Sequence, residues 1–143
     1  MEACYAPPAD TDNDMLARMW IAVARLVKEH FGVEPASTVE YLAWVQRLID
    51  ENALADSVEM SRSLGGVLGI VLVDHVEGLD WCVVNDDEGR DVCLRYRESP
   101  LLIFPLDMIL KRRENKEPFD MTELFRETKR RVEQLALRVQ RVN

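Results

Sequence analysis

The sequence predicts an α+β fold: a single domain with N-terminal helices, a small antiparallel sheet with a β-hairpin, and C-terminal helices. Three observations lead to this prediction. Apolar residues recur at three- and four-residue steps near both ends of the chain, which is typical of amphipathic helices. Between these regions, residues 79–97 alternate apolar and polar side chains, as strands do. The length of 143 residues suits one domain, and 48% hydrophobic residues suffice for its core.

The chain begins with a polar segment that contains proline. We expect residues 1–11 to form a disordered tail and residues 12–143 to form the domain. Asp12 or Asp14 can cap the first helix. Gly32 ends this helix, because glycine adopts the left-handed conformation of a helix end at little cost.

The second helix has a recognisable start. Ser37–Glu40 fits the S-x-x-E capping box, in which the serine accepts from the helix backbone. The apolar stripe that follows, from Tyr41 to Ile49, has helical spacing.

Residues 56–76 permit two interpretations. Their apolar residues suit a buried helix, but the run Ile70–Val73 is also typical of a buried strand. Gly65, Gly66 and Gly69 weaken a helix by about 1 kcal/mol each relative to alanine. We favour the helix, with the glycines letting another element approach closely.

Residues 79–97 predict a β-hairpin with a definite register. Side chains that face each other across an antiparallel pair share one face of the sheet. One register places six apolar residues together, as the pairs Leu79–Tyr96, Trp81–Leu94 and Val83–Val92. The other face then has Asp80 opposite Arg95 and Cys82 opposite Cys93, and residues 85–90 supply the turn.

The C-terminal third predicts a short strand and two helices. Residues 101–104 form the strand, and Pro105 opens a short helix that continues through Arg113. Residues 120–123 resemble a reciprocal cap for a long final helix. We expect five apolar residues on its inner side: Leu124, Phe125, Val132, Leu135 and Val139.

Charge and composition exclude several classes of protein. The net charge is −8, and the part up to Asp107 has 20 acidic and 8 basic residues, which disfavours nucleic-acid binding. No apolar stretch approaches the ~20 residues of a membrane span. The first residues lack the basic and apolar parts of a signal peptide, and three cysteines suit a reducing compartment. We expect a cytoplasmic protein with neither nucleic-acid nor membrane partners.

The chain contains no established catalytic or metal-binding motif, so we expect neither an enzyme nor a cofactor. The candidate for a catalytic residue is His75, which follows Asp74 and could be a general base oriented by a carboxylate. The acidic run 85–88 lacks the order of a calcium loop, and we expect no metal there. Cys82 and Cys93 could form a redox pair, although two thiols are favoured in a reducing compartment.

Four motifs lie between Leu64 and Phe125: a glycine-rich helix, a tryptophan-bearing strand, a turn glycine, and a helix that starts with Phe-Pro and ends with Lys-Arg. They are residues 64–69, 79–84, 89–91 and 103–112. With these motifs the chain resembles a bacterial family of unknown function, DUF3806, from which no activity is carried over. Small acidic proteins similar to this one are often immunity partners of secreted bacterial toxins, which implies such a role here.

The functional hypothesis is therefore a binding protein that occludes the active site of a cognate toxin with a basic surface, for example a nuclease. The acidic hairpin residues Asp86, Asp87 and Glu88, together with Asp80, are the expected binding site, because loop tips meet partners readily. Two alternatives stay open. One is an enzyme that uses His75, and the other is a structural or regulatory subunit that forms a homodimer.

Overall fold

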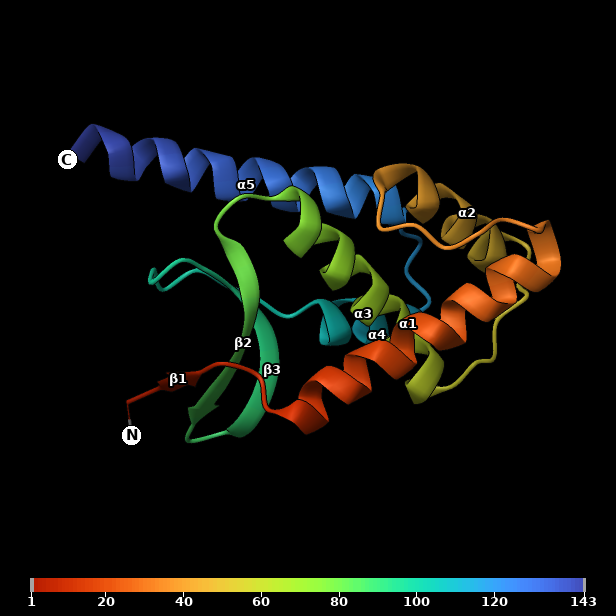
Figure 1. Ribbon diagram of the computed structural model, residues 1–143, viewed down its shortest axis with the longest axis horizontal. Helices are drawn as coiled ribbons and strands as arrows, with labels where there is room; N and C mark the ends of the chain where they lie inside the picture. The colour runs from red at the N-terminus through yellow and green to blue at the C-terminus, as the bar shows by residue number, and fades with distance from the viewer. Residues whose placement is uncertain (1, 143) are drawn as a thin grey trace.

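The computed structural model describes residues 2–142, with side chains described as far as Arg138. It has a four-stranded antiparallel sheet in the order β1-β2-β3-β4, with helices packed against one face (Figure 1). The α+β prediction is confirmed. The elements are β1 (Cys4–Ala6), α1 (Asp10–Phe31), α2 (Val39–Asp50), α3 (Val58–His75), β2 (Leu79–Asp86), β3 (Gly89–Tyr96), β4 (Leu102–Ile103), α4 (Pro105–Glu114) and α5 (Met121–Val142).

The N-terminal segment differs from the disordered tail expected over residues 1–11. Cys4–Ala6 pairs with the free edge of β2, and α1 already begins at Asp10. The pairing uses backbone groups, which any residue other than proline supplies in full, so the polar composition gave no sign of it. Asp12 lies in the first turn, where its carboxylate accepts from the backbone N–H of Ala9 at 2.8 Å.

The hairpin register is confirmed at every predicted pair, including Asp80 opposite Arg95 and Cys82 opposite Cys93. The turn is shorter than the six residues expected. The strands continue to Asp86 and resume at Gly89, whose φ of 120° is one that glycine adopts readily. We call the face with Leu79 and Trp81 the inner face and the face with Cys82 and Cys93 the outer face.

The second helix begins one residue later than the capping box predicts. Thr38, not Ser37, is the N-cap, and its hydroxyl accepts from the backbone N–H of Tyr41 at 3.1 Å. Both residues have a hydroxyl of the right kind, so the choice between them depends on how the preceding chain enters the helix.

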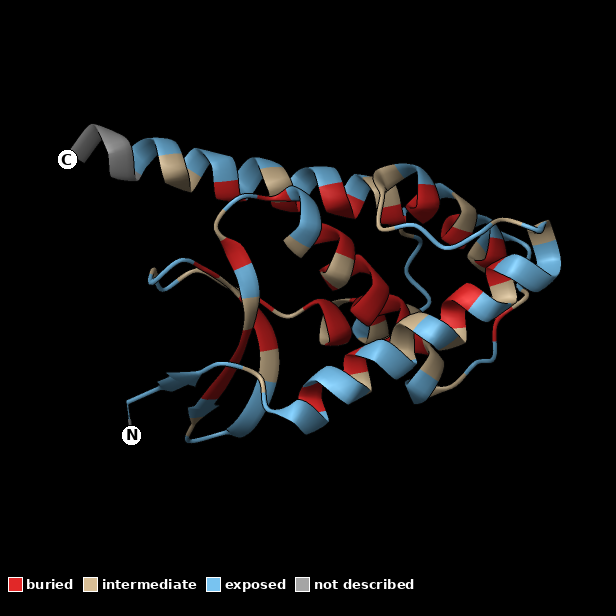
Figure 2. Cartoon of the chain, viewed as in Figure 1, coloured by how far each residue is buried: buried red, intermediate tan, exposed pale blue. Residues whose placement is uncertain are grey.

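Residues 58–75 form a helix, so the strand interpretation of 70–73 is wrong. α3 is buried along most of its length, at the centre of the molecule (Figure 2). A Cβ on Gly65 would lie 2.6 Å from the Cα of Leu106 and would also collide with the carbonyl of Pro105. Gly65 therefore allows α3 and α4 to pack backbone against backbone, which is the close approach expected, whereas Gly69 makes room for the side chain of Trp81.

The core lies between α3, the inner face of the sheet and the other helices. Asp120 Oδ1 accepts from the backbone N–H of Glu123 at 3.0 Å, which confirms the predicted start of α5. Of the residues expected on its inner side, Leu124, Phe125 and Val132 are buried and Leu135 is half-buried. Val139 lies outside the described side chains. None of the helices, over the residues described, is long and apolar enough to cross a membrane.

Candidate functional site

The tip of the β2–β3 hairpin carries three consecutive carboxylates. Asp86 is half-buried, whereas Asp87 and Glu88 are exposed. Asp86 Oδ1 accepts from the backbone N–H of Glu88 at 2.9 Å, which stabilises the turn. The structure thus brings together three of the four residues that the sequence predicts as a site.

A groove of about 440 Å³ lies beside this tip. It is bounded by the hairpin, by β4, by α4 and by Arg131 of α5. We call it the acidic groove because four of its lining residues are carboxylates: Asp86, Glu88, Asp91 and Asp107. Three cations also line it: Lys111, Arg112 and Arg131. None of the four carboxylates is ion-paired among the side chains that the structure describes.

Sequence reasoning missed Asp91 and Asp107. Asp91 lies opposite Val84 on the outer face, next to the tip, and the hairpin register alone was enough to place it there. Asp107 lies in the first turn of α4. Only the packing of α4 beside the hairpin brings it to the groove, so nothing in the sequence pointed to it.

The cation nearest to the tip in the sequence, Arg90, does not neutralise these carboxylates. Arg90 lies two residues beyond Glu88, yet its guanidinium reaches α1 and donates to both oxygens of Asp12, at 2.9 and 2.6 Å. The hydrogen bonds from Arg90 lower the pKa of Asp12 and raise that of Arg90. The positive charge of Arg90 is therefore already paired.

Asp80 is not part of this site. It lies six residues before Asp86 along β2, which corresponds to about 20 Å. Asp80 Oδ1 accepts from the backbone N–H of Trp81 at 2.8 Å. Arg95, directly opposite, donates instead to the backbone carbonyls of Glu98 and Ser99.

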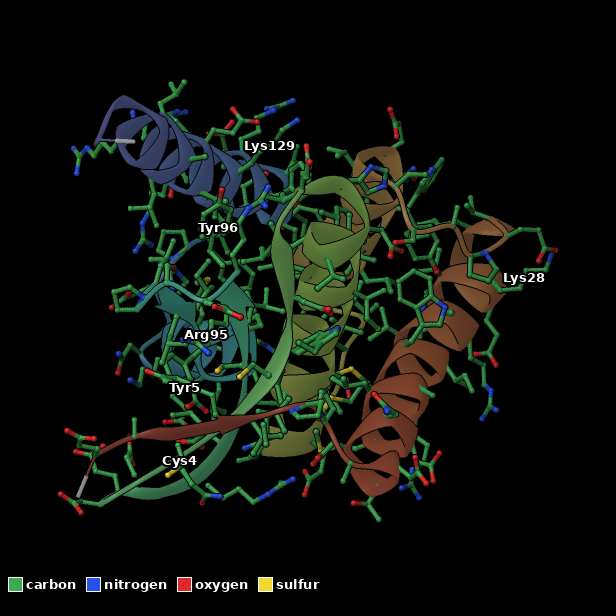
Figure 3. The ribbon with its side chains drawn as sticks, turned by 60° about the vertical axis from the view of Figure 1, so that its left-hand side comes forward. Cys4, Tyr5, Lys28, Arg95, Tyr96 and Lys129 are labelled. Carbon is green, nitrogen blue, oxygen red and sulfur yellow. The ribbon has the colours of Figure 1, made fainter. Side chains whose placement is uncertain are left out.

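Asp80 lines a second groove, of about 530 Å³, on the outer face of the sheet. We call it the outer-face groove. The guanidinium of Arg95 lies over the ring of Tyr5, 3.8 Å from its centroid (Figure 3). Arg97 and Cys82 also line this groove. It therefore combines two cations, an aromatic ring and a thiol.

His75 does not contact the carboxylate that the sequence suggests as its partner, in the part of the chain described. Its Nε2 lies 2.5 Å from the backbone oxygen of Ser37, and its ring meets Phe125 edge-on. Asp74 is exposed, and no hydrogen bond joins it to His75 in the part of the chain that the structure describes. Across the described side chains, no group of three or more His, Cys, Asp or Glu residues is arranged to hold a metal ion.

Comparisons with known proteins give a family and a fold. The family model described as a domain of unknown function (DUF3806) matches residues 40–125. No curated protein matches the chain. A crystal structure of a protein from Bacteroides thetaiotaomicron VPI-5482 superposes with a TM-score of 0.81 at 18% identity. The match covers 90% of this chain and 47% of the Bacteroides protein, so this chain spans about half the length of that protein.

Proposed function

The chain belongs to the DUF3806 family, and from that premise we propose that it is an immunity protein, a non-catalytic binding protein that neutralises a basic toxin. In this role the hairpin tip and the acidic groove bind the toxin and block access to its active site. We place the protein in the cytoplasm. Its three cysteines are free, and free thiols persist in a reducing compartment.

The observation that carries this proposal is the acidic groove with its unpaired carboxylates. Asp86, Glu88, Asp91 and Asp107 line one groove, and none of them is in an ion pair within the described region. Carboxylates accept short, strong hydrogen bonds from arginine and lysine, as phosphates do. Unpaired carboxylates on a projecting hairpin also accelerate encounter with a basic surface.

The surroundings of His75 favour binding over catalysis. A general base needs a free ring nitrogen within reach of a substrate proton. Nε2–H donates to the Ser37 carbonyl and leaves Nδ1 free, but no carboxylate contacts the ring among the contacts described, and His75 lines neither the acidic groove nor the outer-face groove. The proposal of a non-enzyme therefore rests on this geometry as well as on the missing motifs.

Affinity capture with matched baits tests the proposal. The test bait is D86N/D87N/E88Q, which removes three charges, while the amide oxygen introduced at position 86 can still accept the turn hydrogen bond. The control bait is E29Q/D74N/E127Q, which removes three exposed carboxylates from α1, α3 and α5 that are outside the ion pairs described. Both variants change the net charge equally.

We expect the wild-type and control baits to retain a basic partner at low salt, and the hairpin variant to lose it. With the purified partner, the hairpin variant should associate about tenfold more slowly and with a weaker salt dependence. The wild-type protein should also inhibit the toxic activity of that partner. Equal association rates for the two triple variants would remove the hairpin from the binding site.

A further inference from the structure

Cys82 and Cys93 lie directly opposite each other on β2 and β3. Both are buried and both are free thiols. Facing residues of an antiparallel pair have Cα atoms about 4.5 or 5.5 Å apart. Disulfides span Cα separations of about 4.4–6.8 Å, so either spacing falls within the range that a disulfide bridges, and the two side chains share the outer face of the sheet.

The two thiols differ in access. Cys82 is 7% exposed and lines the outer-face groove, whereas Cys93 is 0% exposed and does not line it. Burial raises the pKa of Cys93 to about 12, which keeps it as an unreactive thiol toward reagents in solution. A reagent in the groove therefore meets Cys82 first and can reach Cys93 only through Cys82.

The groove suits a small anionic molecule. Arg95 and Arg97 line it together with one carboxylate, Asp80. The guanidinium of Arg95 donates to backbone carbonyls and stacks on Tyr5, so its positive charge has no carboxylate partner in the described ion pairs. Arg97 is paired only loosely, with an exposed Glu77 carboxylate at 3.8 Å.

We propose that Cys82 and Cys93 form a reversible thiol–disulfide site, and that the outer-face groove admits a small anionic disulfide of the glutathione type to Cys82. This inference is independent of the proposed binding function. It assigns distinct roles to the two cysteines: Cys82 attacks, and Cys93 resolves.

The exchange takes place in two balanced steps. The Cys82 thiolate attacks one sulfur of glutathione disulfide, its S–S bond breaks, and one glutathione leaves and takes up the proton lost by Cys82. Cys93 then loses its proton and attacks Cys82 Sγ, and the second glutathione leaves and takes up that proton. The protein dithiol is oxidised to a disulfide, and glutathione disulfide is reduced to two glutathiones. Excess glutathione reverses both steps.

The test uses the folded full-length protein with the exposed Cys4 replaced, so that only the pair remains. We expect Cys4→Ser protein incubated with glutathione disulfide to lose two hydrogens by intact mass, with Cys82 and Cys93 linked in peptide maps. Adding Cys93→Ala should trap glutathione on Cys82. Adding Cys82→Ala instead should leave Cys93 almost unmodified: glutathione should react with it at least about tenfold more slowly than with Cys82 in the Cys93→Ala variant.

Samples of the Cys4→Ser protein quenched early provide a second measurement that does not depend on the folding of the alanine variants. The mixed disulfide should appear on Cys82 before the linked pair appears. If the pair is oxidised only in denaturant, or if glutathione appears on Cys93 first, the proposal is wrong.

The preference of the groove for an anionic reagent is tested with Arg97→Gln in the Cys4→Ser protein. We expect its reaction with anionic glutathione disulfide to slow by about threefold, while its reaction with neutral 2-hydroxyethyl disulfide stays unchanged. An equal effect on both reagents, or no effect on either, would contradict the preference for an anion.

Discussion

The Asp12 carboxylate at the start of α1 and the Arg90 guanidinium at the start of β3 form a two-point ion pair across 78 positions of the chain. Asp12 is only 5% exposed, and it also accepts from the backbone N–H of Ala9. Three hydrogen bonds thus converge on one buried carboxylate. The pair holds the first turn of α1 against the sheet, next to the hairpin that carries the proposed binding residues.

Asp12→Asn should destabilise the fold. The variant loses the charge and turns an amide N–H₂ toward one of the Arg90 donors, while the shape of the side chain is unchanged. We expect a loss of about 1–2 kcal/mol in the free energy of unfolding, measured by urea denaturation, since the exposed side of Arg90 is screened by water. Asp14→Asn, an exposed carboxylate in the same helix, should change it by less than about 0.5 kcal/mol.

The contribution of Asp12 should depend on pH in one direction. Arg90 lowers the pKa of the folded carboxyl below its ordinary value of 3.8. The unfolded state therefore takes up the proton first as the pH falls, and the stabilisation is lost through the interval below 3.8. The stability difference between wild type and Asp12→Asn should be constant near neutral pH and shrink below about pH 4. A difference that grows on acidification would contradict the ion pair.

Two neighbouring glycines of α3 should respond differently to alanine. At Gly65 the new Cβ would lie 2.6 Å from the Cα of Leu106, and this backbone cannot move without displacing α4. We expect Gly65→Ala to lower the unfolding free energy by about 1–3 kcal/mol despite the higher helix propensity of alanine. At Gly66 the Cβ would meet Met19 Sδ at 3.0 Å and Met19 Cβ at 3.1 Å, so a shift of a few tenths of an ångström suffices, and Gly66→Ala should cost clearly less than Gly65→Ala. Equal effects in thermal unfolding would argue against the close α3–α4 contact.

The start of α2 gives a matched pair of cap variants. Thr38→Ala removes the acceptor for the backbone N–H of Tyr41 and should lower stability by about 1 kcal/mol. The hydroxyl oxygen of Ser37 is buried and has no hydrogen-bond partner in the described structure. Ser37→Ala should therefore be neutral or slightly stabilising, because it removes a desolvated polar group. If chemical denaturation showed a larger loss of stability for Ser37→Ala than for Thr38→Ala, Ser37 would be the N-cap, as the capping box predicts.

The sequence alone determined the hairpin register and the helices and strands other than β1. Period-2 alternation allows one alignment of residues 79–86 with 89–96 that keeps six apolar residues on one face, and a slip of one residue would move the three of one strand to the opposite face. This register was enough to place Cys82 opposite Cys93. It also located Asp86, Asp87 and Glu88 at one tip, because local pairing brings near neighbours in the chain together.

Tertiary packing decided the rest. The pairing of Cys4–Ala6 with β2, the Asp12–Arg90 ion pair and the arrival of Asp107 beside the hairpin each join segments far apart in the chain. The glycines of α3 point to a close approach without saying which element makes it. Side-chain periodicity reports which face of an element is buried, but the partner of that face depends on the three-dimensional path of the whole chain. Asp107 reaches the acidic groove for this reason, whereas Asp80 lies in a different groove simply because six residues of extended strand separate it from Asp86.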